Sequence, residues 1–258
     1  MNSKVSRQSN QSSFRLIQIL ECLSSNRAPM KLQEIAIKTG LTQSTVLRYI
    51  YTLQDENYVF HDEDTSRYAL TWKICQLSDN VRTLLSLRNI TTSFVNLLAN
   101  QLSLGSCLVI EQDFECMYLD CIDNPNTATL QRIGKRAAMH STGSGKVLLS
   151  QFSESQLSSY IASKGLVSFT DKTITNSGVL ISELEKIRAQ GYALDDEECE
   201  LGLRCVSMPL RDYTGKIIAA MSVFGTPDEM TDLRIHTEII PLLSDSTKAI
   251  SRRLGFAD

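Results

Sequence analysis

The sequence predicts an α+β protein in two parts: a small N-terminal domain of helices and a β-hairpin, then a larger α/β domain with an antiparallel sheet. Two observations predict this division. Up to Asp55 apolar residues recur mainly at helical spacing, and two short β-prone runs follow before Trp72. Beyond Asn89 helical and strand patterns alternate without the regular strand–helix–strand repeat of a parallel sheet. The 258 residues accommodate two domains of the usual ~100–200 residues.

The distribution of charge also separates the two parts. The whole chain carries a formal net charge of −3, yet residues 1–54 hold seven cationic and two anionic side chains. The N-terminal part is therefore +5 and the remainder −8. A basic head on an acidic body favours contact between the head and an anionic polymer such as DNA.

Composition argues against several other classes of protein. No apolar run approaches the ~20 residues of a membrane span, and the polar first fifteen residues do not resemble a signal peptide. The seven cysteines include no CxxC pair, and the three histidines lie at no metal-ligand spacing. We expect a cytoplasmic protein with reduced thiols, no cofactor, no metal and no membrane partner.

The N-terminal domain is predicted over residues 12–72, after a disordered basic arm at residues 1–11. Ser12 or Ser13 is expected to cap the first helix. Its core face is predicted from residues spaced three apart: Phe14, Ile17, Leu20 and Leu23.

The stretch from Leu32 to Tyr51 has the spacing of a helix-turn-helix. Ala36 is small enough for two helices to cross closely, Gly40 can end the first helix with a positive φ, and Val46 can anchor the second. Thr42 is the expected N-cap of this second helix. We expect it to present outward a set able to contact phosphates and base edges: Gln43, Ser44, Thr45, Arg48, Tyr49 and Thr52.

A β-hairpin is predicted directly after the helix-turn-helix. Residues 58–61 and 67–70 are β-prone and flank the polar turn 62–66, which is the arrangement of a wing. The acidic tip of this turn suits phosphate contact poorly, so we expect only Arg67 and the strand edges to approach DNA.

Residues 73–88 carry an apolar helical stripe formed by Ile74, Leu77, Val81, Leu84 and Leu85. This predicts a linker helix that pairs with its mate in a dimer. A helix that simply packs on the second domain is the alternative.

The second domain is expected over residues 89–258. Helices are predicted near 90–103, 154–163, 178–190 and Met230–Leu254, and strands at Cys107–Ile110, Met117–Ile122, Leu203–Leu210 and Ile217–Phe224.

The segment Ser141–Lys146, STGSGK, is the first candidate site in this domain. It lacks the first glycine and the final Ser or Thr of a nucleotide-binding P-loop, because His140 and Val147 stand there. A glycine-rich turn that enters a helix still offers free backbone N–H groups to a carboxylate. An ordinary helix start, capped by Ser141 or Thr142, is the alternative.

The second candidate is Gly191–Pro209, which contains an acidic cluster and Cys205. The cluster could be a solvated loop, and a lone cysteine on a strand is most often simply buried. As a nucleophile Cys205 would need a nearby base. His140 is the only histidine in the surrounding loops, and nothing in the sequence orders it for that role. We therefore expect no enzymatic activity and no catalytic residues.

Over nearly its whole length the chain resembles the IclR-type bacterial transcriptional regulators. The resemblance rests on TQSTVLRYIYTL and RYALTWK in the N-terminal part. In the C-terminal part it rests on Ile133–Ser150 and Arg188–Val223. It implies a winged helix-turn-helix joined by a linker helix to a GAF-like effector-binding domain. It also implies dimers or tetramers on palindromic operators and the sensing of a small organic or sugar acid.

The resemblance also implies effector-binding residues: Gly143 and Ser144 in the loop, Thr142 less securely, and Asp195, Cys205 and Ser222. Where some relatives place a second serine, this chain has Phe224. The pocket then loses a hydroxyl and gains bulk. A hydroxylated monoacid such as an aldonic acid is favoured, because Asp195 would repel a bare dianion.

We therefore predict a DNA-binding regulator, a repressor of a catabolic operon, controlled by a small carboxylate. Two alternatives stay open at this point. One is a GAF-like ligand or redox module that uses Cys205, and the other is a winged helix that serves protein interaction.

Overall fold

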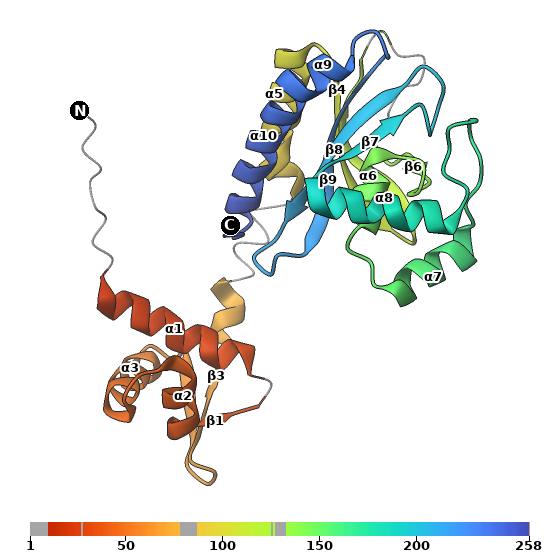
Figure 1. Cartoon of the computed structure of the whole chain (residues 1–258). Coiled ribbons are helices and arrows are strands. Elements are labelled where there is room, and N and C mark those ends of the chain that lie inside the picture. The colour runs from red at the N-terminus through yellow and green to blue at the C-terminus, as the bar shows by residue number, and fades with distance from the viewer. Residues whose placement is uncertain (1–9, 27, 78–86, 125, 127–132, 258) are drawn as a thin grey trace. The chain divides into compact units, whose positions relative to one another are not determined.

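The structure is a computed structural model that describes residues 10–26, 28–77, 87–124, 126 and 133–257. The chain divides into two compact units, Met1–Leu84 and Leu85–Asp258 (Figure 1). Nearly all of the predicted arm, residues 1–9, lies outside the described residues.

The first unit is a helical domain completed by a three-stranded antiparallel sheet. Its core is formed by residues from all three helices, including Ile19, Ile35, Val46 and Ile50. The sheet has the order β1-β3-β2. The helices are α1 (Gln11–Ser25), α2 (Leu32–Thr39) and α3 (Gln43–Asp55), and the strands are β1 (Met30–Lys31), β2 (Val59–Asp62) and β3 (Arg67–Leu70).

Helix α1 differs from the prediction in its cap and in its buried face. Asn10 is the N-cap, and its side-chain oxygen accepts a hydrogen bond from the Ser12 N–H at 3.0 Å. The buried residues of α1 are Ile19 and Leu23, whereas Phe14 and Ile17 are 61% and 51% exposed. The core stripe thus follows a three–four spacing rather than the strict three-residue spacing that we predicted.

The helix-turn-helix geometry is confirmed. Gly40 adopts φ +67° at the end of α2. Thr42 caps α3 by accepting a hydrogen bond from the Thr45 N–H. Ala36 and Val46 are both buried where the helices meet. The predicted hairpin is also present, with the register Val59↔Leu70, whereas β1 was not predicted.

The predicted linker helix is only partly described. Residues 73–77 are helical, but residues 78–86 lie outside the described residues. The following helix, α5 (Leu87–Leu102), belongs to the second unit. A continuous helix over 73–88 and its role in pairing stay predictions.

The second unit is built on a six-stranded sheet of order β6-β5-β4-β9-β8-β7, in which every pairing is antiparallel. The strands are β4 (Gly105–Gln112), β5 (Glu115–Ile122), β6 (Arg136–Ala137), β7 (Ala193–Asp196), β8 (Arg204–Arg211) and β9 (Ile217–Gly225). The two shortest strands, β6 and β7, were not predicted.

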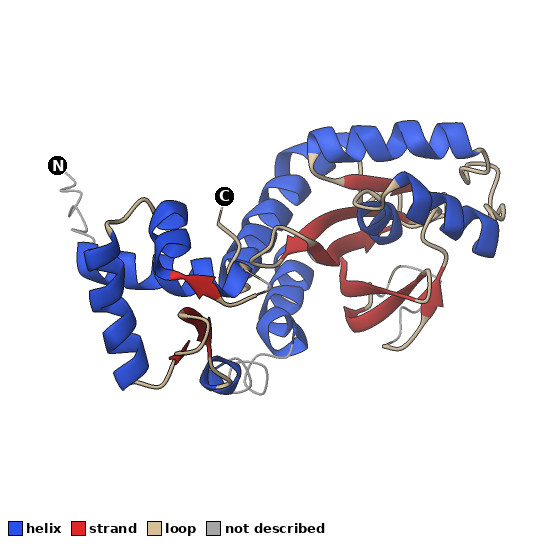
Figure 2. Cartoon of the chain, turned by 90° about the horizontal axis from the view of Figure 1, so that it is seen from below, coloured by secondary structure: helices blue, strands red, loops and turns tan. Residues whose placement is uncertain are grey.

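Helices lie on both faces of this sheet (Figure 2). The helices are α5, α6 (Gly143–Leu149), α7 (Glu154–Lys164), α8 (Ser177–Gln190), α9 (Asp232–Arg234) and α10 (Ile240–Arg253). A π-helical turn, η1 (Ile235–Ile239), precedes α10. The predicted final helix therefore begins two residues later than expected, where Thr231 caps α9.

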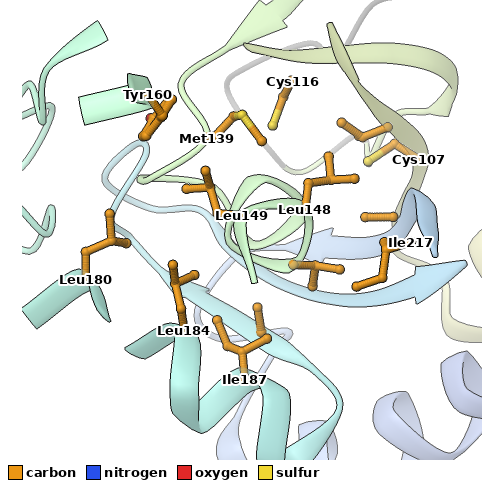
Figure 3. Packing of buried hydrophobic residues seen from close by; sticks show 14 of the residues in the cluster. Cys107, Cys116, Met139, Leu148, Leu149, Tyr160, Leu180, Leu184, Ile187 and Ile217 are labelled. Carbon is orange, nitrogen blue, oxygen red and sulfur yellow. The ribbon is translucent and has the colours of Figure 1, made fainter. Parts of the chain in front are cut away.

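Each face of the sheet carries its own hydrophobic core. On one face, α5 and α10 pack on residues such as Leu108, Val206 and Val223. On the other face, α6, α7 and α8 pack on Cys107, Val109 and their neighbours. Figure 3 shows this second core, with residues of α8 (Leu180, Leu184 and Ile187) aligned along one side of the helix. The candidate site lies in this layer, between α6 and the sheet.

Candidate functional site

Two neighbouring rows of residues cross the sheet beneath helix α6. In the first row, Asp195 of β7 pairs with Cys205 of β8, Cys205 with Phe224 of β9, and Phe224 with Gly105 of β4. In the second row, Ser207 pairs with Ser222, and Ser222 with Cys107. Side chains at alternate positions of a strand share a face. The sheet therefore brings Asp195, Cys205 and Ser222 together from segments that are far apart in the sequence.

The loop that enters α6 lies over these rows. Thr142 caps the helix: its hydroxyl donates to the Ala138 carbonyl oxygen at 3.0 Å and accepts from the Gly145 N–H at 3.1 Å. The first N–H groups of a helix have no partner within the helix. Among the described residues, no acceptor faces the N–H groups of Gly143 and Ser144. This loop therefore offers two backbone donors at the positive end of a helix dipole.

The glycines of this loop are required by its close packing. A Cβ atom on Gly145 would lie 2.2 Å from the Met139 carbonyl oxygen. A Cβ on Gly143 would lie 2.7 Å from the Ser207 hydroxyl oxygen and 3.6 Å from the Cys205 sulfur. Without side chains at these two positions, α6 approaches both its own preceding loop and strand β8.

Three buried serine hydroxyls connect α6 to the sheet. Ser144 Oγ lies 2.5 Å from Ser222 Oγ, which lies 2.6 Å from Ser207 Oγ. Ser207 was not predicted as a site residue. It lies two residues after Cys205 on the same strand, so strand alternation was the signal that could have identified it.

A small cavity lies between the loop and the first row. It is lined by five of the predicted residues (Thr142, Gly143, Ser144, Asp195 and Cys205) and by Cys107, Tyr118, Cys199, Leu203 and Phe224. Its volume is about 20 Å³, which is room for about one water molecule. The structure thus brings the predicted effector residues around one cavity, with Ser222 directly behind Ser144.

Asp195 is the charged group of this cavity, and it is 3% exposed. Its carboxylate accepts hydrogen bonds from the Glu198 N–H at 2.8 Å and the Cys199 N–H at 3.3 Å. Burial and the charge of Glu198 nevertheless raise the pKa of Asp195 to about 7, against the lowering effect of Lys146. Near neutral pH this group can therefore be an acid that donates a hydrogen bond or an anion that accepts one.

A buried ion pair lies beside the cavity. Lys146 of α6, which is 1% exposed, pairs with Glu198, and its Nζ lies 3.6 Å from an oxygen of Glu183 on α8. Glu198 Oε2 has no hydrogen-bond partner among the described residues. The acidic cluster is therefore not one solvated loop, because two of its carboxylates, those of Asp195 and Glu198, are buried.

The thiols around the cavity are poorly suited to redox or nucleophilic chemistry. Burial raises the pKa of Cys205 to about 12 and that of Cys199 to about 11. A reactive cysteine needs a thiolate, so both thiols are inert at neutral pH. His140 offers no base: its ring nitrogens lie 2.8 Å from the Tyr160 hydroxyl and 2.9 Å from the Val167 carbonyl oxygen. Within the described residues no group of His, Cys, Asp or Glu is arranged to hold a metal ion.

The first unit presents a second candidate surface, the outer face of α3. Gln43, Ser44 and Arg48 are exposed there, and Thr45 is half-buried beside the cap residue Thr42. Tyr49 is not on this face, contrary to the prediction. It is 7% exposed and belongs to the buried stripe of Val46, Ile50 and Leu53.

Tyr51 is the exposed tyrosine of α3, with 57% of its surface accessible. It lies three residues after Arg48, which places it on the same face of the helix. Tyr51 was not predicted as a contact, although Tyr49 lies three residues after the predicted anchor Val46 and therefore on the core side of the helix.

The predicted contact residue Arg67 is engaged within the first unit. Its guanidinium donates to the Pro29 carbonyl oxygen at 2.8 Å and lies 3.6 Å from Glu34. These contacts join strand β3 to β1 and α2. A DNA contact by Arg67 stays a prediction, and it would require these bonds to be shared or broken.

Comparison with known proteins identifies the family of the chain. The model of the IclR helix-turn-helix domain matches residues 13–63. The model of the bacterial transcriptional regulator IclR C-terminal domain matches residues 81–252, well over half of the chain. This chain belongs to the IclR family. It is therefore a DNA-binding transcriptional regulator with a C-terminal effector-binding domain, as its family members are, and not an enzyme.

Individual IclR-family relatives match along the whole chain. The acetate operon repressor of Salmonella typhimurium is 30% identical over 256 residues, which cover 95% of this chain and 90% of that protein. The crystal structure of the Thermotoga maritima IclR protein is 30% identical, with a TM-score of 0.63 and coverage of 95% of this chain and 99% of that chain.

A third relative was solved with a ligand. It is a double mutant of the inducer-binding domain of the PobR transcription factor from Acinetobacter, in complex with 3-hydroxybenzoic acid. It is 27% identical, with a TM-score of 0.60, and covers 65% of this chain and 98% of that chain.

Among the helices of the described residues, none has both the length and the apolar character that a membrane span requires.

Proposed function

We propose that this IclR-family chain is a cytoplasmic repressor of a catabolic operon that a small monocarboxylic acid controls. The acid binds in the cavity between the α6 loop and the sheet. The DNA-binding unit recognises a palindromic operator as part of a homodimer or homotetramer. Acid binding changes operator affinity, because an effector shifts an equilibrium only by its different affinity for two states.

The proposal of an acid effector rests on the backbone N–H donors at the cavity. The N–H groups of Gly143 and Ser144 are free at the start of a helix, and the Thr142 cap fixes their direction. Donors of this kind favour an anion. An acid ligand in the inducer-binding domain of a relative agrees with this class of effector.

The remaining lining favours a monoacid over a diacid. Asp195 would repel a second carboxylate when it is ionised, and it can donate to one ligand oxygen when it is protonated. The Ser144 hydroxyl lines the cavity and offers a further polar contact to a hydroxylated acid. An aldonic acid would need the cavity to widen well beyond its volume of about 20 Å³.

The DNA part of the proposal assigns base and phosphate contacts to the outer face of α3. Gln43, Ser44, Thr45 and Arg48 are the predicted contacts, and Tyr51 takes the place that we first gave to Tyr49. Arginine reads guanine through two hydrogen bonds, so Arg48 is the expected base contact. The repressor part is supported by a relative that is named as one.

Operator binding and acid binding can be tested in one assay with the full chain. Fluorescence anisotropy would follow a labelled DNA fragment from upstream of the gene, over a salt series and against unrelated competitor DNA. We expect competitor-resistant binding that weakens linearly with the logarithm of salt concentration. A panel of monocarboxylates would then be added, and at least one should lower operator affinity. Binding that shows no preference for operator DNA, or operator binding that no acid changes, would contradict the proposal.

A further inference from the structure

Phe224 lines the cavity, and the backbone of Gly105 makes room for its ring. The two residues are direct partners on neighbouring strands. A Cβ atom on Gly105 would lie 2.3 Å from both Cε2 and Cζ of the Phe224 ring. Real Cβ atoms do not approach other atoms so closely, so the ring can occupy this position only because residue 105 is a glycine.

The ring lies in the first row of the site, beside Cys205 on the other neighbouring strand. Phe224 is 2% exposed and lines the cavity together with the polar loop residues. The lining therefore has a polar part and an apolar part. Loop donors and Asp195 contribute polar atoms, and Phe224, Leu203 and Tyr118 contribute apolar surface.

A cavity of about 20 Å³ is far smaller than the ~300–1,000 Å³ of typical ligand pockets. The Phe224 ring and the Tyr118 ring are the two largest groups in the lining, and Phe224 is the one of the two that has no polar atom. The side chain at position 224 therefore decides how much of an acid, beyond its carboxylate, the pocket can hold.

We infer that Phe224, seated over Gly105, is the residue that sets the size of the effector. The carboxylate is held at the α6 loop, and the rest of the acid extends toward the Phe224 ring. Even an acid of two or three carbons needs more room than the cavity of about 20 Å³ provides. The Phe224 ring limits how far the pocket can widen, so the native pocket selects such short acids over ring-sized acids. This inference rests on the proposed function, because it assumes that the cavity binds a carboxylate.

The experiment compares acetate, pyruvate and benzoate binding to the full chain by titration calorimetry. The chains are the parent, Phe224→Ala, Phe224→Leu and Phe152→Ala. The last is the matched control: it removes a phenylalanine that packs on the same core but does not line the cavity. We expect Phe224→Ala to bind benzoate at least about tenfold more tightly than the parent, since a well-filled pocket discriminates by such factors. Phe224→Leu should be intermediate, and Phe152→Ala should match the parent.

Equal benzoate affinity in the parent and in folded Phe224→Ala or Phe224→Leu would overturn the inference. Thermal unfolding of each variant shows whether it is folded. If Phe224→Ala does not fold, Phe224→Leu still provides the comparison with the parent. A neutral probe separates this inference from the proposed function. If toluene raises the Tm of Phe224→Ala while no carboxylate binds any chain, the ring fills the cavity as inferred but the carboxylate effector is wrong.

A second pair of variants tests the role of Gly105. Gly105→Ala should force the ring into the cavity and abolish binding of the short acids. Adding Phe224→Ala to Gly105→Ala should restore binding, because the clash then disappears. Short-acid binding that survives in folded Gly105→Ala would contradict the inferred position of the ring.

Discussion

At the scale of single residues, the cavity concentrates buried polar groups whose protonation depends on their neighbours. Asp195 is buried beside Glu198 and Lys146, and it accepts two backbone hydrogen bonds that fix its position. The family resemblance implied Asp195 and Cys205 as effector-binding residues, and they are ten residues apart in the sequence. That separation is explained by the sheet, in which the two residues are direct cross-strand partners.

The raised pKa of Asp195 predicts a pH-dependent stability. Below its unfolded pKa of about 4, Asp195 is protonated in both states. As the pH rises toward 7, only the folded chain still holds this proton, so the free energy of unfolding falls. Asp195→Asn keeps an oxygen acceptor and cannot ionise. We expect the variant to be more stable than the parent at pH 8, by on the order of 2–4 kcal/mol, and to lose this advantage near pH 4.

Urea unfolding of both chains at pH 4 and pH 8 measures this difference. Asp196→Asn is the matched control, because Asp196 is the next residue on the same strand and its side chain is half exposed. The same dependence on pH in the parent and in Asp195→Asn would show that Asp195 does not titrate in this range.

Lys146 predicts a second effect at this scale. Its side chain is buried and contacts the carboxylates of Glu198 and Glu183, so its removal leaves the Glu198 carboxylate buried without its partner. We expect Lys146→Ala to lower the free energy of unfolding by about 3–5 kcal/mol. Lys186→Ala is the control, because Lys186 also lies near Glu183 but is largely exposed. Equal stability losses in the two variants, measured by urea unfolding, would contradict the assigned role.

At the scale of elements, sequence periodicity predicted the long helices and strands and missed three short strands. Strands β1 and β6 have two residues each, too few to show an alternation. Strand β7 has four residues, as the predicted strands β2 and β3 do, but its acidic residues are typical of a loop. The burial of Asp195 depends on pairing with β8, which no local pattern reveals. Ser207 was missed for a different reason: strand alternation places it on the same face as Cys205, but the family resemblance implied only Cys205.

In helix α3 one residue was assigned to the wrong face, which changed the predicted contact surface. The turn, the cap and the anchoring residue Val46 were all predicted correctly. Tyr49 was nevertheless assigned to the outer face, although it lies three residues after Val46 and is buried. The exposed face was otherwise well predicted at Gln43, Ser44 and Arg48.

This exposed face predicts the effect of substitutions on operator binding. Arg48→Ala should weaken binding by about 1–3 kcal/mol if Arg48 reads a base. Tyr51→Ala should also weaken it, because its ring stands on the same exposed face. Glu21→Ala, on α1, is the control outside α3. Anisotropy with labelled operator measures each affinity, and an unchanged affinity in folded Arg48→Ala would remove Arg48 from the contact surface.

The close packing of helix α6 predicts that a side chain at its glycine positions would be destabilising. Gly145→Ala would place a Cβ atom 2.2 Å from the Met139 carbonyl oxygen. Because backbone cannot move aside as a flexible side chain can, the helix must shift, and both stability and acid binding should fall. Gly178→Ala is the control, since a Cβ there meets only the Asn176 side chain, at 3.2 Å. A Tm of Gly145→Ala equal to that of Gly178→Ala would contradict this account.

At the scale of the whole molecule, the chain combines a basic DNA-binding unit with an acidic unit that encloses the cavity. Charge asymmetry and the change of hydrophobic pattern predicted this division, and the helix-turn-helix spacing together with the family resemblance predicted the class of protein. The identity of the acid could not be predicted, because it depends on a cavity whose walls come from five strands and two loops. The regulatory account requires that occupancy of this cavity changes the DNA affinity of the other unit.

The most direct test of that central claim measures operator affinity with and without an acid that calorimetry shows to bind. The coupling should change affinity by about 5–150-fold, which corresponds to ~1–3 kcal/mol. Gly143→Ala, whose Cβ would lie 2.7 Å from the Ser207 hydroxyl, should lose this response together with acid binding. If the acid binds the parent chain and operator affinity does not change, or if Gly143→Ala responds as the parent does, the account is contradicted.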